Sequence, residues 1–581
     1  MEIYFLKVAG CCRRPFLFYH LMKSTTVLVS LCSLVPLPVF GFGADDASRP
    51  TPPTESRPAD RAIHDDAATA GAVKADADQV LLPSLRGLAI ASTAVSALAL
   101  QQKSQDGIHL EGFTASEQAE IRRVAAEELG RPVSLRSLER LNSKLEQSFR
   151  LLGRPFVQVS FPEQEITSGV IALLICPARA GQVLVAGNPS FGAGFSAAAF
   201  RTRPGDEISG DVVLADLDWL NENPLRRASI SYSDGTSPDI LDLTLRVRAK
   251  KSWRVYAGID NQLSDNLGDE RIFMGAQYGD LFGLDHRITA QYTSALETKN
   301  LQGFSGIYEI PLPIRHLLEI SAGYTESESN SVGPIDQSGQ FSRLAVGYRV
   351  PLPRWHAISQ EWRAGLEFRS NDYLFSNQTS SQVKFFQIGT GWKGRRTDRW
   401  GMMRLDASVL YSPGQGMLGS EDADFIVLGV DGAESWIGRL EFERTWKLGE
   451  IATLVGRGQA QWADSTLLSS DQISAGGVSR VRGFDETVGY ASKGVVASIE
   501  LQSRNFQVPK SGEFQAISFL DGAVLNRDQS GDAGQLASVG VGLRWRYAER
   551  LSAKLDLGVP VDHPADLGGD PVLHFSVSTN W

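Results

Sequence analysis

Histidine and cysteine, two residue types that often carry catalysis, are few in this chain, and their spacing builds no site. No two histidines stand at the spacing of a metal-ligand pair, and the sequence has neither a Gly-x-Ser-x-Gly nucleophile elbow nor a phosphate-binding glycine loop. We therefore expect no catalytic residue, no metal and no cofactor, and we do not expect an enzyme. The eight histidines are His20, His64, His109, His286, His316, His356, His563 and His574.

Cysteine usage points the same way. Cys11, Cys12 and Cys32 lie in or before the export signal predicted below, so only Cys176 is expected in the mature chain. A single cysteine forms no internal disulfide, and no CxxC metal pair is present. The formal net charge of −10 also argues against a nucleic-acid partner, because phosphate binding requires a basic surface.

The last ten residues, Val572 to Trp581, alternate between apolar and polar types and end on an aromatic residue. Leu573, Phe575, Val577 and Trp581 share one face, which is the pattern of a strand with one apolar and one polar side. Bacterial outer-membrane barrels commonly end in such a strand, which closes the barrel and places its aromatic residue at the membrane interface.

From Trp253 onward the chain is expected to contain strands only. Segments near 343–350, 436–448 and 539–547 each alternate, with charged residues on the second face. A lipid-facing wall around a polar lumen explains this repetition better than a soluble sandwich. The 329 residues from Trp253 to the end accommodate sixteen strands at about 21 residues for each strand and its connection. Counts of 14 or 18 fit as well.

The first 80 residues are expected to precede the folded domains. An apolar run, Thr25 to Phe40, follows Lys23 and precedes small residues, so residues 1–44 are predicted to be a signal peptide, with Met22 as an alternative start. A membrane anchor helix is the alternative, which two prolines in the run disfavour. Residues 45–80 are rich in Ala, Asp and Pro and are predicted to be a linker. Arg61 to Asp78 is its candidate plug helix.

Two αβ modules are predicted between the linker and the barrel, at residues 81–181 and 182–250. In the first, helix-forming composition covers Ala115 to Leu129, Ser134 can cap a second helix, and apolar residues then recur at helical spacing. That apolar stripe is expected to be the core of a small domain: Leu135, Leu138, Leu141, Leu145, Phe149 and Leu152. In the second, a short helix at Val212 to Leu220 lies among strands. Residues 251–581 are assigned to the barrel.

Two motifs lie within the expected barrel. One is Ile473 to Glu486, centred on Val481-Arg482-Gly483-Phe484, and the other is Ile517 to Ala523. Here the chain resembles the two-partner secretion transporters, the TpsB or haemolysin activator (ShlB/FhaC/HecB-like) family of the BamA-like POTRA-barrel superfamily. In that family a VRG[FY] tip of an external loop folds back into the lumen, and its arginine pairs with the aspartate of an F-x-D-x-G strand.

The resemblance implies a pair between Arg482 and Asp521, with Phe519 as the aromatic residue of the partner motif. A lumenal arginine needs a carboxylate, and burial strengthens the pairing. Gly483 would permit a tight tip. The chain departs from the family pattern at Ala523, where the final glycine of the motif is expected, while glycine occupies position 522.

Further landmarks follow in order over about 500 residues. They are Gly153 to Gly169, resembling the end of the first POTRA domain; Val183 to Asn188, Arg203 to Asp206 and Leu220 to Pro224, resembling the second; and Ala257 to Asn261 and Gly279 to Asp285, resembling the first barrel strands. The resemblance thus implies a β-barrel membrane protein, with a C-terminal, about 16-stranded antiparallel transmembrane barrel behind two αβ POTRA domains.

The function implied by the resemblance is polypeptide export across the bacterial outer membrane. Periplasmic POTRA domains would capture an unfolded exoprotein (a TpsA-like client) by adding it to a sheet edge, and the barrel would pass it to the surface. A BamA-like insertase that assembles other outer-membrane proteins is the alternative, and a passive porin is a weaker one. Outer-membrane lipid and the barrel-assembly machinery are the further expected partners, the latter through a C-terminal signal at Phe575 and Trp581.

Overall fold

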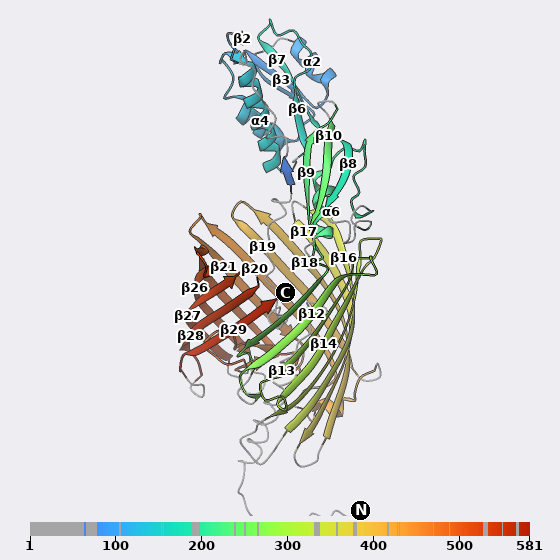
Figure 1. The fold of residues 1–581 in the computed structure, drawn as a ribbon, viewed down its shortest axis with the longest axis vertical. Coiled ribbons are helices and arrows are strands. Elements are labelled where there is room, and N and C mark those ends of the chain that lie inside the picture. Colours follow the sequence, from blue (N-terminus) through green and yellow to red (C-terminus); the bar gives the residue numbers. More distant parts are fainter. Residues whose placement is uncertain are drawn as a thin grey trace, which may run out of the picture.

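The computed structural model places two small αβ domains in a line at one end of a large β-barrel (Figure 1). The described residues are 63–65 and 78–581, except for 104–105, 153, 155, 188–194, 196–197, 237–239, 249–250, 264–266, 330–336, 356–357, 376–379, 415–417, 427, 429, 469, 487, 527–532, 549 and 565–568. The predicted signal peptide, residues 1–44, lies outside them. None of the helices in this described part is long and apolar enough to cross a membrane.

The first αβ domain has a four-stranded sheet in the order β4-β3-β7-β6, with helices packed on it. Its strands are β3 (Gly87–Ala91), β4 (Gly107–Glu111), β6 (Val157–Ser160) and β7 (Val170–Pro177), and a separate pair joins β2 (Val80–Leu82) to β5 (Val133–Ser134). Its helices are α2 (Ala94–Gln102), α3 (Ala115–Ala125) and α4 (Leu135–Leu151).

Local sequence signals account for both longer helices of this domain. Thr114 and Glu117 form a reciprocal capping box at the start of α3. The Ser134 hydroxyl accepts a hydrogen bond from the Ser137 N–H at 3.3 Å, as expected of the residue before α4. The predicted stripe of α4 was too long, because Leu135 is 52% exposed and Leu152, just past the helix, is 41% exposed, while the middle of the stripe is buried.

The second αβ domain contains β8 (Arg179–Gly187), β9 (Arg227–Asp234), β10 (Ile240–Arg248) and helix α6 (Gly210–Leu220). The first sheet ends at Pro177 and the second begins at Arg179, so the junction precedes the boundary expected after residue 181. A buried core between α6 and the sheet includes Leu217, Leu220, Leu243 and Leu245.

A three-residue strand, β1 (Ile63–Asp65), adds to the second sheet by pairing in parallel with β9. These residues lie in the stretch named above as the candidate plug helix, and they are extended rather than helical. Their extended conformation is fixed by the free edge of β9, a partner more than 160 positions away that local composition does not reveal. The remainder of the candidate plug helix, apart from Asp78, lies outside the described residues.

The barrel is closed and antiparallel, and the prediction of about sixteen strands is confirmed for the described residues. Seventeen strand segments make up the wall, but β24 and β25 both pair with β26 and occupy one position in it, which leaves sixteen. The segments are β11 (Trp253–Asp260), β12 (Arg271–Leu281), β13 (His286–Ala295), β14 (Leu301–Pro311), β15 (Leu317–Ser329), β16 (Gln337–Trp355), β17 (Ile358–Phe375), β18 (Ser380–Asp398), β19 (Gly401–Pro413), β20 (Glu434–Leu448), β21 (Ala452–Ala463), β24 (Lys493–Ser503), β25 (Phe506–Val508), β26 (Gly512–Asn526), β27 (Ala533–Tyr547), β28 (Leu551–Asp562) and β29 (Val572–Asn580).

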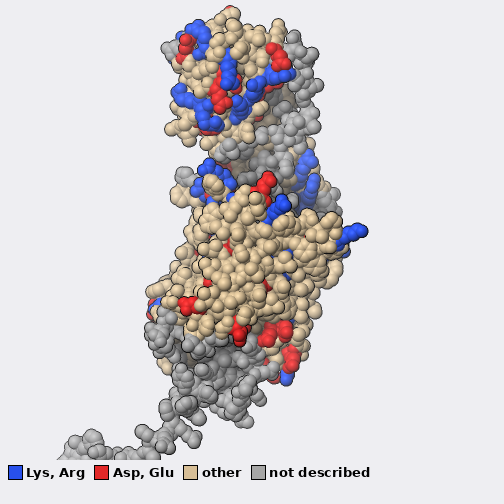
Figure 2. Space-filling model, turned by 90° about the vertical axis from the view of Figure 1, so that its left-hand side faces the viewer, with Lys and Arg blue, Asp and Glu red and all other residues tan. Residues whose placement is uncertain are grey.

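The two faces of the wall differ in polarity, as the alternating sequence predicts. In β24, Val495 and Ile499 are more than half exposed on the outside. Glu500, which lies between the outward residues Ile499 and Leu501, is 3% exposed and faces inward. Figure 2 shows few charged side chains over the middle of the barrel face that it presents. An apolar exterior around a charged interior is the arrangement that a lipid bilayer requires.

Pairing of the last strand, β29, with the first, β11, closes the barrel. Only five residue pairs are in register there, from Tyr256↔Asn580 to Asp260↔Ser576. Trp581 extends the seam, because its N–H donates to the Val255 carbonyl at 2.9 Å, and its own carbonyl accepts from the Val255 N–H at 3.4 Å.

Candidate functional site

A long connection between β21 and β24, residues 464–492, folds into the barrel interior and is called the lumen loop here. It lies at the end of the barrel away from the αβ domains, since the β16–β17 turn at the other end contacts α6. Two short segments, β22 (Ile473–Ser474) and β23 (Tyr490–Ala491), pair to form its stem. The loop therefore has a defined conformation, and its motif forms the tip of the stem.

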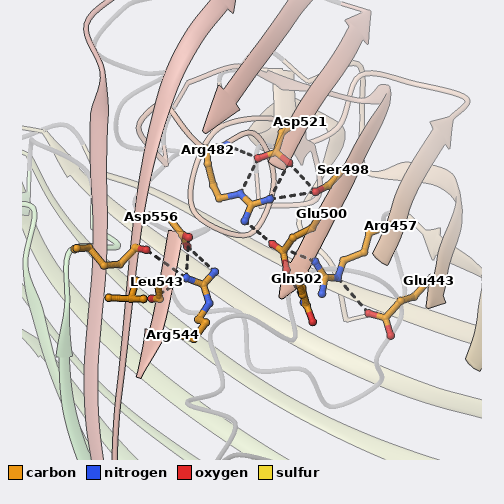
Figure 3. Close-up of polar contacts among 11 residues, drawn as sticks. Glu443, Arg457, Arg482, Ser498, Glu500, Gln502, Asp521, Leu543, Arg544 and Asp556 are labelled. Carbon is orange, nitrogen blue, oxygen red and sulfur yellow. Dashed lines mark hydrogen bonds and ion pairs between the residues drawn. The ribbon is translucent and has the colours of Figure 1, made fainter. Parts of the chain in front are cut away.

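An ion pair holds the tip of the lumen loop to the barrel wall (Figure 3). The Arg482 guanidinium donates to both carboxylate oxygens of Asp521 on β26, from Nε at 2.8 Å and from Nη2 at 2.9 Å. The Arg482 backbone N–H also donates to Asp521 at 3.2 Å. Both side chains are buried, at 4% and 1% exposure. The two residues that the resemblance pairs are thus in direct bidentate contact.

Three further wall residues hold the same guanidinium. Nη1 of Arg482 donates to Glu500 on β24 at 2.7 Å, and Nη2 donates to the Ser498 hydroxyl at 3.3 Å. The Ser498 hydroxyl in turn donates to Asp521 at 2.6 Å. The guanidinium carbon lies 3.5 Å from the centre of the Phe519 ring, which places the aromatic residue of the partner motif in a cation–π contact.

Sequence reasoning did not identify Ser498 or Glu500, although a signal was present. Glu500 lies between the outward residues Ile499 and Leu501, so the alternation already directed a carboxylate into the lumen. Arg457 on β21 lies 3.9 Å from Glu500 and 3.2 Å from Glu443, which extends the charge network along the wall (Figure 3). Arg482 therefore binds two carboxylates, Asp521 and Glu500, rather than Asp521 alone.

Gly483 allows the tip to approach the wall at backbone distance. Its φ of +103° lies in the region that favours glycine. A Cβ added to the facing Gly558 on β28 would lie 2.3 Å from the Gly483 nitrogen, so both positions exclude a side chain as they stand. The Gly483 N–H points toward Nε2 of His574 on β29 at 3.5 Å.

Val481 and Phe484, the apolar members of the motif, anchor the tip in a small hydrophobic core. Val481 is 0% exposed and Phe484 is 3% exposed, and they pack with wall residues that include Ala523 and Leu536. Ala523 thus stands in this core where the family pattern has glycine, and its methyl group contributes to the packing rather than preventing it. The described residues accordingly bring all four motif residues against the β24–β28 sector of the wall.

A second polar cluster joins the second αβ domain to the barrel. Asn223, just after α6, is fully buried and donates to the Gly279 carbonyl at 2.6 Å and to Asp285 at 2.8 Å. Arg226 donates to both carboxylate oxygens of Asp285, at 2.7 and 3.1 Å. Two of the family landmarks, Leu220 to Pro224 and Gly279 to Asp285, are therefore the two halves of one joint, a relation that their sequence order did not reveal.

Helix α6 adds charge contacts to this joint. Asp218 pairs with Arg354 at 2.9 Å and with Arg395 at 3.3 Å, both of which belong to the barrel. Burial raises the pKa of the Asp218 carboxyl, while Arg395 and Arg354 oppose that shift. These contacts fix the second domain over the mouth of the barrel.

The predicted C-terminal residues lie on the seam. Trp581 is 52% exposed on the outer face, and the backbone N–H of Phe575 donates to the Asn261 side chain at 2.7 Å. Phe575 and Trp581 thus belong to the seam that closes the barrel and not to the lumen loop.

Among the described residues no group of three or more His, Cys, Asp or Glu side chains could hold a metal ion.

Family models and curated relatives that match this chain describe outer-membrane secretion proteins. A model for the haemolysin secretion/activation protein ShlB/FhaC/HecB matches residues 241–545, and one for the POTRA domain, ShlB-type, matches residues 105–178. The outer membrane transporter CdiB of Dickeya dadantii (strain 3937) is 22% identical over 429 residues, which cover 71% of this chain and 74% of that protein. The outer membrane transporter CdiB-2 of Burkholderia pseudomallei (strain 1026b) is 23% identical over 458 residues, covering 75% and 76%.

The fold is also that of a solved transporter. The structure of CdiB from Escherichia coli matches with a TM-score of 0.63 at 16% identity, over 99% of this chain and 100% of that one. At that identity the match shows the fold alone. The first family model, in contrast, covers more than half of the sequence. The chain therefore belongs to the ShlB/FhaC/HecB family of haemolysin secretion/activation proteins, the two-partner secretion transporters of the bacterial outer membrane, whose POTRA domains lie in the periplasm.

Proposed function

We propose that this chain exports one large unfolded exoprotein, a TpsA-like client, which its POTRA domains capture and its barrel passes to the cell surface. The observation that carries the proposal is the lumen loop, whose tip is held in the barrel by Arg482, Asp521 and Glu500. Ion pairs and hydrogen bonds are reversible, so a loop held in this way can close the lumen at rest and yield to a passing chain.

Capture in the periplasm is supported by the edge of the second POTRA sheet. Strand β9 accepts Ile63–Asp65 as an added parallel strand, so its edge is geometrically able to take up an extended segment. Main-chain hydrogen bonds of this kind tolerate many sequences, which suits an unfolded client. The periplasm holds no ATP, and folding of the client outside the cell would supply direction.

The proposal assigns no catalytic step to the chain, and neither a cofactor nor a nucleic acid to its partners. Outer-membrane lipid covers the apolar face of the barrel, and the barrel-assembly machinery reads the terminal strand at Phe575 and Trp581. The insertase alternative is less well supported, because the matching family model describes secretion/activation proteins.

A reconstituted system tests this proposal. The purified chain is placed in liposomes with its POTRA domains outward, and the unfolded secretion domain of a candidate exoprotein is added without ATP. We expect the added domain to become protected from external protease. If it stays fully digestible while the same liposomes accelerate insertion of an unfolded outer-membrane barrel, the insertase function is favoured and the proposal fails.

A further inference from the structure

The base of the lumen loop, some ten residues before its tip, is held by a second buried anchor. Asp471 is 6% exposed, and its carboxylate accepts hydrogen bonds from Arg369 on β17 at 2.7 Å and from Gln387 on β18 at 3.3 Å. Its backbone carbonyl accepts from Arg439 on β20 at 3.1 Å and from Gln461 on β21 at 2.8 Å. Side chains from four strands, two on either side of β19, thus converge on one loop residue.

Apolar packing reinforces the same base. Leu468 belongs to a buried cluster with Phe385 of the wall and Phe425 of α7 (Asp422–Ile426), a short helix in the external connection before β20. The Leu467 N–H donates to the Ser492 hydroxyl at 2.9 Å, which ties together the two ends of the loop. The base is therefore a built contact, and its aspartate is not an ordinary loop charge.

The base anchor and the tip anchor use different parts of the barrel. Asp471 is held by β17, β18, β20 and β21, whereas Arg482 is held by β24 and β26. Among the described residues, none that binds the Asp471 carboxylate also binds Arg482. Arg369 has a second partner, Glu367, at 2.8 Å, so loss of the Asp471 charge would not leave it without a counter-ion. Each anchor can therefore break while the other stays intact.

We propose that Asp471 is a second latch of the lumen loop, holding its base to β17 and β18 while Arg482 holds the tip to β26, so that the lumen opens fully only when both contacts break. Asp471 acts here as a positioning residue. That the opening admits a polypeptide rests on the proposed function, whereas the latch itself does not. A loop held at two sectors obstructs more of the lumen than a loop held at its tip alone.

Single-channel conductance in planar bilayers, without any client, tests the latch. The proteins compared are the wild-type chain, Asp471→Asn, Asp521→Asn and the double variant. Asparagine keeps the size of Asp471 but loses the charge that draws Arg369, so we expect large open events to become about ten- to a hundredfold more frequent. Because the anchors are separate, the double variant should exceed the wild type by about the product of the two single effects.

Matched controls isolate the anchor. Asp464→Asn removes a charge from the same loop at an exposed position, where the side chain accepts from the Trp436 backbone N–H and the Ser465 hydroxyl, and it should leave conductance unchanged. Asp471→Glu keeps the carboxylate and should restore much of the wild-type closure. If Asp471→Asn fails to assemble, Gln387→Met removes one donor without a change in charge, and it should raise open events in the same direction.

The outcomes separate the latch from the proposed function. Equal conductance of Asp471→Asn, Asp464→Asn and wild type, all of them folded, would overturn the latch even if secretion of a client is normal. A double variant no more open than Asp521→Asn would also overturn it, because the base would then add nothing to the tip. If Asp471→Asn raises conductance but no protein, wild type included, exports a client, the latch is supported and the proposed export function is rejected.

Discussion

Replacing Arg482 by alanine removes the centre of the tip network, and the structure indicates how large the effect should be. The change deletes two hydrogen bonds to Asp521, one to Glu500 and one to Ser498. Asp521, 1% exposed, would keep only the Ser498 hydroxyl and the backbone N–H of residue 482. Glu500 would keep Gln502 at 2.6 Å and a longer contact with Arg457 at 3.9 Å.

Leaving a buried charge without its partner costs about 3–5 kcal/mol. Each 1.4 kcal/mol is about a tenfold change in an equilibrium, so the balance between seated and released tip should shift by roughly two to three and a half orders of magnitude. The wall itself is held by strand pairing, to which Arg482 does not contribute. We therefore expect the barrel still to assemble. We expect secretion of the client to be lost, because on the proposed function export needs a tip that is seated at rest as well as one that yields to a passing chain.

The assay has two readouts from one strain: client on the cell surface or in the medium, and the heat-dependent gel mobility of the barrel, which reports its folding. Arg482→Lys is the matched control, since it keeps the charge but not the fork that meets Asp521 on two oxygens, and it should retain intermediate secretion. Wild-type secretion by a folded Arg482→Ala protein would refute the role given to this residue.

Three further predictions concern positions outside the ion pair. Deleting Trp581 removes two hydrogen bonds from a seam of five residue pairs, so the level of folded barrel in the membrane should fall before any defect specific to secretion, as heat-dependent gel mobility would show; normal barrel levels would contradict this. Gly558→Ala places a Cβ against the loop tip and should impair secretion at normal barrel levels, whereas Gly522→Ala, whose Cβ would meet its nearest atom at 3.5 Å, should be silent; equal secretion by both would reject the close approach. Asn223→Ala takes the side-chain donor from the buried Gly279 carbonyl, at a cost of about 1–3 kcal/mol, and leaves Asp285 with Arg226, so protease should cut the periplasmic domains from the barrel faster than in wild type; unchanged cleavage would argue against this joint.

The barrel could be predicted because its signal is local. Alternation with a period of two repeats in every strand, and Glu500 between Ile499 and Leu501 shows that even the inward charges follow it. The number of strands could not be fixed in the same way, because it depends on connection lengths that vary freely. Division of the chain length allowed 14, 16 or 18.

Contacts between segments that are far apart in the chain could not be predicted from the sequence pattern. Arg482 and Asp521 were paired only through the family resemblance. Neither the anchor at Asp471 nor the joint at Asn223 could be seen, since Arg369 is 102 positions from Asp471 and Asp285 is 62 positions from Asn223. Ile63–Asp65 is a further example, because a distant strand determines its conformation. Its Ala-, Asp- and Pro-rich surroundings predicted a linker with only a candidate helix, but pairing with β9 makes these three residues a strand.

The most direct test of the central claim is to delete this gene in the bacterium that encodes it and to measure two quantities together: the surface proteins and the levels of unrelated outer-membrane barrels. We predict that one large exoprotein disappears from the surface and the medium, that the other barrels remain at normal levels, and that the wild-type gene restores the exoprotein while Arg482→Ala does not. A general loss of outer-membrane barrels, with no single exoprotein affected, would contradict the account.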